Sequence, residues 1–381
     1  MNLRLPSRTS TIAALLVALA GCATPQTRMP TVDSTAMQEE TRKQREMVVE
    51  DYMNSYRRLQ AVASKIVVSG TELCADKVGP YYGLTAWSRE DFDKEWHDVV
   101  QSRFGVGDVA SISSVVPGSA AEYAGVKAGD VVISVNGWTP PAGKGAVDKL
   151  MEKLMEKLAA EGKFGMPLEL VVRRGAEEVK LSMMPGQACD FHVRLSPDDV
   201  KNAYADGKNI VIYKGMMDFF RTDEEVALVV SHELAHNAMK HIDAKKTNAM
   251  VGGLVGLLLD VAAAAGGVNT NGDFTRLGSN IGAGVYSVSF EQEADYVGLY
   301  FMANAGYKID DAAGFWRRMA TTNSKAITMK SSHPTTPERF IAIESAVDEI
   351  KQKLHDGQPL KPELKDPPQE IAKEEVRAIP H

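Results

Sequence analysis

Two histidines spaced by one helical turn constrain this chain more than any other feature. An apolar run, residues 226–230, leads into Ser231-His232-Glu233-Leu234-Ala235-His236. Ahead of it, Thr222 and Glu225 have the spacing of a capping box, which predicts a helix start. Side chains four residues apart lie on one helix face, so His232 and His236 can bind the same Zn²⁺. We therefore expect a zinc site on a buried helix.

Glu233 directly follows the first of these histidines. From there a carboxylate can reach a metal-bound water as general base without binding the metal. By residue frequencies, a chance H-E-x-x-H in a chain of this size is roughly a one-in-a-hundred event. His241 lies five residues beyond His236 and does not share its face on a continuous helix. We therefore expect His241 to be a solvated histidine at the helix end.

A catalytic zinc needs a third protein ligand and one position for water. A second helical pattern, residues 289–299, carries Glu291 and Asp295 one turn apart. We expect Glu291 to ligate the metal and Asp295 to accept a hydrogen bond from a ligand imidazole, which fixes its tautomer. Glu293 points elsewhere on helical geometry. The alternative is a solvated acidic helix face.

His333 and Arg339 stand at the start of a third predicted helix. A histidine and an arginine near a zinc site can stabilise an oxyanion. His333 has a second interpretation, as a fourth metal ligand that closes the site in a resting form. A loop histidine with a purely structural role is the third.

The N-terminus has the pattern of an export signal. Residues 1–21 combine two arginines with a short apolar run, and Leu19-Ala20-Gly21-Cys22 resembles the lipobox of bacterial lipoproteins. The resemblance implies cleavage before Cys22 and lipidation of its thiol. The next residue, Ala23, is not the Asp of an inner-membrane retention signal, so we expect an envelope lipoprotein of the outer membrane that faces the periplasm. Of the chain's 3 cysteines, this leaves Cys74 and Cys189, which an oxidising compartment favours as a disulfide; two buried thiols are the alternative.

Between residues 98 and 187 the pattern is that of short strands and turns. We expect strands near residues 110–116, 131–135, 168–174 and 179–183, with helices at 120–124 and 148–160. From Pro117 to Gly137 this segment resembles a PDZ domain, which binds an extended peptide as an added strand. The resemblance places a carboxylate-binding loop at Arg103-Phe104-Gly105-Val106, where backbone N–H groups can meet a peptide C-terminus. A structural turn without ligand is the alternative.

The three site segments together resemble the zinc metallopeptidases of the HtpX and CAAX-prenyl-protease type, family 48 of the metallopeptidases. The resemblance covers residues 195–350 and implies a mainly helical fold with a small sheet and endopeptidase activity. It also implies that a substrate strand adds to Ile210–Tyr213, and that Cys74 and Cys189 pin the two ends of an inserted PDZ domain. One position departs from the family, since Val288 stands where an arginine is frequent.

The predicted fold class is α+β: a mainly helical, gluzincin-like zinc metallopeptidase domain with a small sheet, and an inserted β-rich PDZ domain. We expect a signal peptide at residues 1–21, a tether at 22–45, an N-terminal peptidase helix at 46–75, the PDZ domain at 98–187, the peptidase domain at 190–352 and a disordered tail at 353–381. The apolar stretch from Met250 to Val268 is expected to be a buried helix over the active site; a lid or a membrane-facing segment is the alternative.

These features predict a zinc endopeptidase, one Zn²⁺ per chain, that acts on polypeptides of the bacterial envelope, misfolded ones above all. Its PDZ domain would bind a peptide or protein C-terminus. A net charge of −7 disfavours nucleic acid as a partner. The second hypothesis is a lipid-anchored chaperone or scaffold with a closed zinc site. A purely structural zinc is a third, and it is disfavoured because no cysteine lies near the motif.

Overall fold

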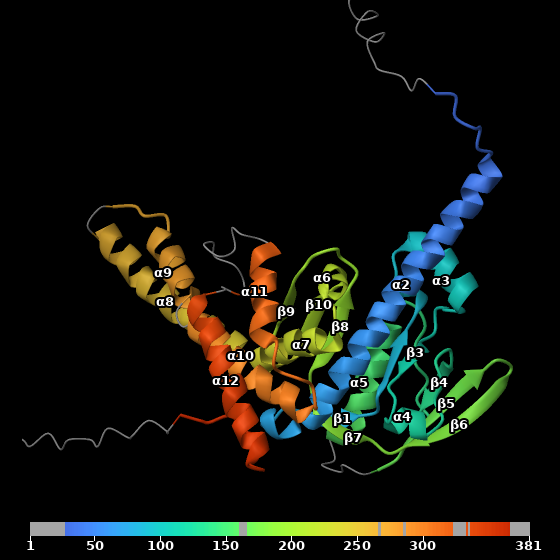
Figure 1. Cartoon of the computed structure of the whole chain (residues 1–381). Coiled ribbons are helices and arrows are strands. Elements are labelled where there is room, and N and C mark those ends of the chain that lie inside the picture. Colours follow the sequence, from blue (N-terminus) through green and yellow to red (C-terminus); the bar gives the residue numbers. More distant parts are fainter. Residues whose placement is uncertain are drawn as a thin grey trace, which may run out of the picture. The chain divides into compact units, whose positions relative to one another are not determined.

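The computed structural model describes residues 27–159, 166–265, 268–284, 287–322, 333 and 336–365 (Figure 1). The chain divides into two compact units, residues 1–45 and 46–381. In the first unit the described residues form the beginning of helix α2 (Ser34–Ser69), where the side chains are almost all exposed. The predicted signal peptide and the lipidation site Cys22 lie outside the described residues.

A five-stranded antiparallel sheet has a core of its own. Its order is β2-β3-β4-β5-β6, with bounds Leu84–Trp87, Ser111–Val115, Val131–Val135, Leu168–Arg174 and Glu177–Met183. Two helices accompany it, α4 (Ala120–Tyr123) and α5 (Ala146–Ala159), and α5 buries Leu150 and Leu154 against the sheet. The sequence predicted these elements except β2, whose four residues are too few for a clear alternation.

Short helices precede β3: η1 (Thr71–Leu73), η2 (Arg89–Asp91), η3 (Lys94–Trp96) and α3 (His97–Phe104). Apolar side chains of α3 and α2 form a small cluster that includes Val49, Met53, Val99 and Val100. This cluster joins the start of the sheet region to the long helix.

A two-stranded ribbon joins the beginning and the end of the sheet region. Strand β1 (Val78–Tyr81) pairs antiparallel with β7 (Gly186–Cys189). A disulfide joins Cys74 and Cys189 across 115 residues of sequence. The two ends of the inserted region therefore meet, as the sequence predicted.

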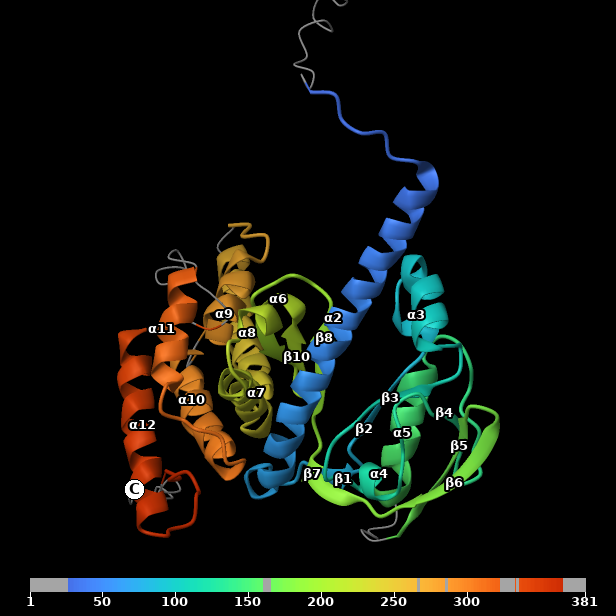
Figure 2. The same ribbon diagram turned by 45° about the vertical axis from the view of Figure 1, so that its right-hand side comes forward.

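The remaining residues form a mainly helical region around the largest core (Figure 2). It contains a small sheet of order β8-β10-β9, with bounds His192–Ser196, Asn209–Tyr213 and Ala203–Ala205. Its helices are α6 (Lys214–Phe219), α7 (Asp223–Ala238), α10 (Ser287–Asn304), α11 (Ala312–Thr322) and α12 (Pro337–His355). A Cβ added at Gly298 of α10 would lie 3.2 Å from the backbone of His232, so this glycine lets α10 approach α7 closely.

Strand β10 corrects one expectation. A substrate strand was expected to add to Ile210–Tyr213, but β10 lies in the middle of its sheet, parallel to β8 and antiparallel to β9. Both of its edges are thus already hydrogen-bonded. The two outer edges of this sheet belong to β8 and β9, and the short strand β9 packs against α7.

The start of the predicted tail is also ordered. Helix α12 runs to His355, and the Lys353 ammonium then binds the Lys361 carbonyl at 2.8 Å and the Glu363 carboxylate at 2.6 Å. Residues 356–365 therefore fold back on α12, which the high content of charge and proline did not suggest.

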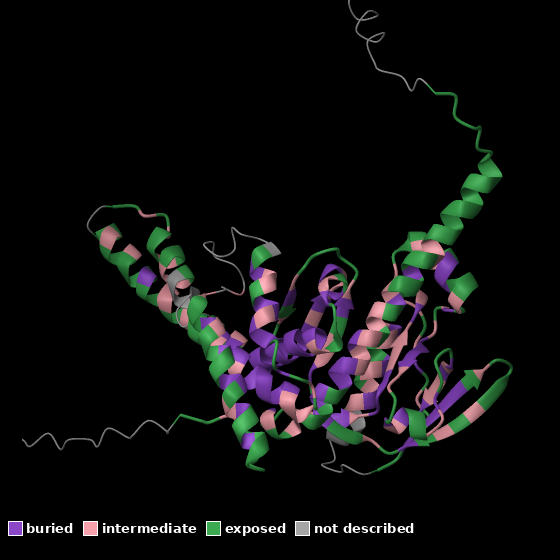
Figure 3. Ribbon diagram, viewed as in Figure 1, coloured by how far each residue is buried: buried purple, intermediate pink, exposed green. Residues whose placement is uncertain are grey.

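Between the helices α7 and α10 the chain forms a helical hairpin, α8 (His241–Ala265) and α9 (Asp273–Gly284). The expected buried helix over the site is not observed, because only His241 and Gly256 of α8 are buried. Figure 3 shows the hairpin exposed along most of its length. Among the described residues, α8 is the one helix long and apolar enough to cross a membrane by length and composition.

Candidate metal centre

Helix α7 carries the histidine pair into the core. Thr222 caps the helix by accepting a hydrogen bond from the Glu225 backbone, and the Glu225 carboxylate accepts one from the Arg221 N–H at 2.7 Å. From Glu225 to Ala238 every residue is buried. His232 and His236 are 1% and 2% exposed, and their Nε2 atoms face each other at 3.2 Å.

Helix α10 supplies a carboxylate opposite the pair. The two oxygens of Glu291, which is fully buried, lie 3.4 Å from the Nε2 atoms of His232 and His236, one oxygen to each. His333 completes the group, because its Nδ1 lies 3.3 Å from His232 Nε2 and 2.8 Å from a Glu291 oxygen. The donor atoms of these four residues all lie within 4.8 Å of one another.

The spacing of the donors fits a metal ion. A tetrahedral ion with bonds of about 2.0–2.1 Å holds its ligand atoms about 3.3–3.4 Å apart. The observed distances of 3.2, 3.3 and 3.4 Å between the donors match this value. Oε1 of Glu291 also has no hydrogen-bond partner among the described residues although it is buried. The cluster is thus arranged to bind a cation.

Asp295 and Arg339 lie behind this donor cluster. The Asp295 carboxylate is 3.0 Å from His232 Nδ1, beside the imidazole that it was expected to orient, but this nitrogen makes no well-aligned hydrogen bond among the described residues. Arg339 was expected to steady an oxyanion, but its Nε and Nη2 both donate to Asp295 at 2.8 Å, and its Nη1 lies 3.4 Å from Glu291. The guanidinium, in a side chain that is 1% exposed, is therefore engaged with the carboxylates that support the cluster.

His241 corrects a second expectation. It is 1% exposed rather than solvated, and its Nδ1 lies 2.9 Å from His236 Nδ1, while its Nε2 lies 2.9 Å from Glu293. The helix α7 ends before it, and Lys240 has a positive φ of 57°. That break turns the chain back, so His241 contacts the far side of His236. The expectation for His241 assumes an unbroken helix, which the structure does not have. Glu293, expected to point away from the metal, is not among the donors and contacts His241 instead.

Glu233 lies beside the donor cluster without belonging to it. Its side chain is 2% exposed, one oxygen is 3.4 Å from His333 Nε2, and the other has no hydrogen-bond partner among the described residues. A buried carboxylate oxygen without a partner is costly for folding alone. Its position next to a metal centre suits proton transfer.

The electrostatics agree with a cluster of ligands. Burial lowers the pKa of His236 to about 3, which keeps its imidazole neutral. Burial also disfavours the cation of His232, but its contacts with Asp295 and Glu291 outweigh this and raise its pKa to about 9. Contacts with three histidines lower the pKa of the Glu291 carboxyl against the effect of burial. A metal cation would replace the proton that these carboxylates attract.

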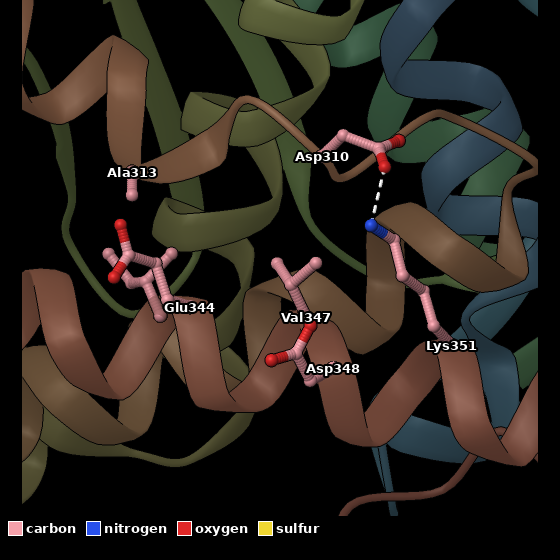
Figure 4. Close-up of a pocket in the computed structure, with 7 residues that line it drawn as sticks. Asp310, Ala313, Glu344, Val347, Asp348 and Lys351 are labelled. Atoms are coloured by element: carbon pink, nitrogen blue, oxygen red, sulfur yellow. Dashed lines mark ion pairs between the residues drawn. The ribbon is translucent and has the colours of Figure 1, made fainter.

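The remaining predicted site residues lie elsewhere. Arg103 and Phe104 end helix α3, and the N–H groups of Gly105 and Val106 donate to the carbonyls of Gln101 and Val100. These two N–H groups are therefore used in the helix end, which corrects the expectation that they meet a peptide carboxylate. A pocket between α11 and α12 (Figure 4) shares no residue with the donor cluster; it is lined by Asp310, Ala313, Ile343, Glu344, Val347, Asp348 and Lys351.

Comparison with known proteins places this geometry in a family. The sequence pattern of peptidase family M48 matches residues 167–347, which include the whole donor cluster. The chain contains a peptidase family M48 domain. A PDZ domain pattern matches residues 111–140, inside the five-stranded sheet. The M48 match begins at residue 167, directly before β5, so its first residues belong to the five-stranded sheet rather than to the helical region.

Curated relatives of the M48 domain are named as peptidases. Mitochondrial metalloendopeptidase OMA1 of Saccharomyces cerevisiae is 27% identical over 169 residues, 42% of this chain and 47% of its own. The putative beta-barrel assembly-enhancing protease of Vibrio cholerae is 31% identical over 150 residues, 36% of this chain and 31% of its own. The chain thus spans less than half the length of either relative.

Among solved structures, the PDZ domain of HtrA3 with a phage-derived ligand is 22% identical to this chain. The match covers 29% of this chain and 88% of that one, with a TM-score of 0.22.

Proposed function

We propose that the chain is a zinc-dependent metalloendopeptidase of the bacterial envelope. The observation that carries the proposal is the buried, partly unpartnered carboxylate of Glu233 beside four converging metal donors. A structural metal site has no use for such a group. The names of the M48 relatives support the same reaction class.

His232, His236 and Glu291 would hold the zinc, and Asp295 would keep His232 in the tautomer that presents Nε2. Zinc bound there supplies Lewis acidity toward water and the peptide carbonyl. Glu233 takes a proton from the attacking water and delivers it to the leaving amide nitrogen. Arg339 acts as a positioning residue, since it holds Asp295 and Glu291 in place.

The position of His333 determines whether the metal site is open to water and substrate. A catalytic zinc keeps one position for water. His333 Nδ1 lies 3.3 Å from His232 Nε2, the separation expected for two ligands of one tetrahedral ion, while its 2.8 Å distance to Glu291 is that of a hydrogen bond. We infer that His333 occupies the water position in a resting form and that it must move before a substrate is cut. Oxyanion stabilisation by His333 belongs to the open form.

Two further elements would handle the polypeptide. The free edge of β9 beside α7 would align a substrate strand, in place of β10. The PDZ region would capture substrates or control their access to the site, and these substrates would be misfolded envelope proteins. The lipobox-like sequence that ends at Cys22 supports lipidation there, which would keep the enzyme at the outer membrane, on the periplasmic side.

The test follows cleavage of unfolded casein by the zinc-loaded full chain, with the Glu233→Gln variant as its isosteric control. We expect the parent to cleave and the variant to lose about 10²–10⁴-fold in rate, while both keep one zinc per chain. Cleavage by both proteins would mean that the assignment of Glu233 is wrong.

The same assay can distinguish the peptidase from a lipid-anchored chaperone or scaffold. The scaffold is the alternative because the position of His333 is also compatible with a permanently closed metal site. If parent and Glu233→Gln variant are both inert and hold zinc, the His333→Ala variant decides. Cleavage by that variant supports a closed peptidase. Continued inactivity, together with suppressed aggregation of an unfolded protein by the parent, supports the scaffold.

A further inference from the structure

The hairpin α8–α9 has its apolar side chains on the outside. Ten large apolar residues of the two helices are between 40% and 68% exposed. They are Met250, Val251, Leu254, Val255, Leu257, Leu258, Leu259, Val261, Phe274 and Leu277. A water-soluble hairpin usually buries such residues against its partner helix. An apolar surface of this extent marks a place where something other than water lies.

Small residues fill the contact between the two helices instead. A Cβ on Gly256 would collide with the carbonyl oxygen of Phe274, and one on Gly278 would collide with that of Gly252. Gly252 and Gly256 are spaced four apart in α8. Close helix contact through glycines at this spacing is the packing mode of helices in lipid, where large apolar side chains face outward.

The dimensions and hydropathy of α8 also suit a bilayer. The helix has 25 residues, and its most apolar window has a mean hydropathy of 1.7. A helix of that length measures about 37 Å, compared with about 30 Å for the hydrocarbon core of a membrane. A core helix of a soluble protein can be equally apolar, but only 11% of this window is buried.

The distribution of charged residues in the hairpin is also compatible with contact with a lipid bilayer. Between residues 250 and 265 the sequence has one charged side chain, Asp260. Its carboxylate is satisfied within the hairpin by the hydroxyl and the N–H of Thr275, at 2.6 and 2.9 Å, by the Phe274 N–H at 3.2 Å and by the Thr270 hydroxyl. Lys245 and Lys246 lie five and four residues ahead of Met250, where the apolar stretch begins, and the Lys246 ammonium is 3.9 Å from the Asp243 carboxylate. Lysines at this boundary complement anionic lipid headgroups.

We propose that the outward face of the α8–α9 hairpin is a membrane-docking surface, which enters the acyl-chain region of an anionic phospholipid bilayer. The occupant is lipid rather than a second chain, because the face is wide, aliphatic, almost free of aromatic anchors and bordered by lysines. Interfacial protein surfaces are instead enriched in aromatic residues and arginine. The hairpin follows His236 and precedes Glu291, so docking places the donor cluster beside the membrane surface.

The test reads the depth of single residues in vesicles and needs no peptidase activity. A cysteine carrying an environment-sensitive fluorophore replaces Leu258, which is 64% exposed, in the full chain with Glu233→Gln. The matched control carries the label at Tyr123, which is 83% exposed and lies in the five-stranded sheet region. The parent without an added cysteine reports any labelling of Cys22.

With vesicles of phosphatidylethanolamine and phosphatidylglycerol, we expect the emission at position 258 to shift to the blue, to rise severalfold and to be quenched by acyl-chain spin-labelled lipid. The label at position 123 stays unchanged. Equal behaviour of the two labels would overturn the proposal. So would a blue shift that needs no vesicles and grows with protein concentration, since that indicates contact with a second copy.

A second variant guards against a misfolded hairpin. Leu254→Asp and Val261→Asp place charges on the outward face, where both side chains are more than half exposed, so the fold is expected to persist. The label at position 258 should then stay in water, with an unchanged circular dichroism spectrum. Undiminished quenching in this variant would contradict docking by the outward face.

Discussion

Helices α7 and α8 are consecutive and both apolar, yet they occupy opposite environments. From Glu225 onward α7 is buried, whereas α8 buries only His241 and Gly256. In α7 the side chains of His232, Glu233 and His236 lie in or beside the donor cluster, and in α8 the large aliphatic side chains are turned outward. Apolar content can therefore predict that a segment is a helix, but it does not determine whether that helix will be buried in the protein core or exposed on its surface.

The difference in burial between α7 and α8 depends on the helix that packs against each of them. Helix α10 approaches α7 at Gly298 and covers it together with the rest of the large core. Helix α9 approaches α8 closely at Gly252, Gly256 and Gly278 and leaves the large apolar side chains of α8 exposed. Four substitutions test this contrast, from the largest expected effect to the smallest.

Arg339→Met should cost the most, because it leaves Asp295 and Glu291 as buried carboxylates without their cation. Removal of one partner from a buried ion pair costs about 3–5 kcal/mol. Chemical unfolding of the metal-free chain measures the change. The control, Arg317→Met, breaks an exposed pair with Glu344 and should stay within about 1 kcal/mol. Equal effects of the two would show that the buried region tolerates an uncompensated charge.

Glu225→Gln tests the start of the buried helix. Burial raises the pKa of this carboxyl, but two bonds from Arg318 at 2.6 Å and the Arg221 N–H outweigh it, and the pKa is lowered. The stabilisation is therefore present above the unfolded pKa of about 4.3 and is lost as the pH falls through the lower, folded value. At neutral pH the variant should lose about 1.5–3 kcal/mol.

Urea unfolding of Glu225→Gln at several pH values checks this prediction. The difference from the parent should disappear in acid, where the parent carboxyl is protonated. A difference that stays constant down to acid would show that packing, rather than charge, is responsible.

His241→Ala removes the contact on the far side of His236. Loss of a partner that orients a metal-bound histidine typically lowers metal affinity about 10–100-fold. Zinc competition with a chromogenic chelator measures it. His355→Ala is the matched histidine control, because that side chain is 84% exposed, and its affinity should equal the parent's. A parent-like affinity for His241→Ala would reduce His241 to a packing role.

Leu258→Ala should have the smallest effect. In water, an exposed side chain contributes within about 0.5 kcal/mol, whereas Leu234→Ala in α7, at 0% exposure, should cost about 2–5 kcal/mol. Thermal unfolding without lipid compares the two. A large loss for Leu258→Ala in the absence of lipid would mean that a protein surface covers the hairpin, and the contrast between the two helices would fail.

Much of the site could be predicted from local periodicity. His232, His236, Glu291 and Asp295 converge as the one-turn spacings indicated. Periodicity is reliable within one helix, and each of these pairs lies within one helix. The same holds for the strands of the sheet region, whose alternating patterns and turn residues are local signals.

The features that could not be predicted from the sequence depend on where a helix ends and on which distant residues pack against a segment. His241 reaches the site because the backbone turns at Lys240, a residue type with no special preference for positive φ. Arg339 binds the Asp295 carboxylate 44 residues away, and tertiary packing determines whether the guanidinium meets this carboxylate or a substrate. The central place of β10 follows from its pairing with β8, which a single-strand pattern does not specify.

The disulfide between Cys74 and Cys189 gives the chain a topology that its fold alone does not. Residues 74–189 form a covalent ring, and the helical region is attached to that ring at one point. A single backbone cut anywhere inside the ring opens it without releasing a fragment. The sheet region and the M48 domain therefore remain one molecule after such a cut.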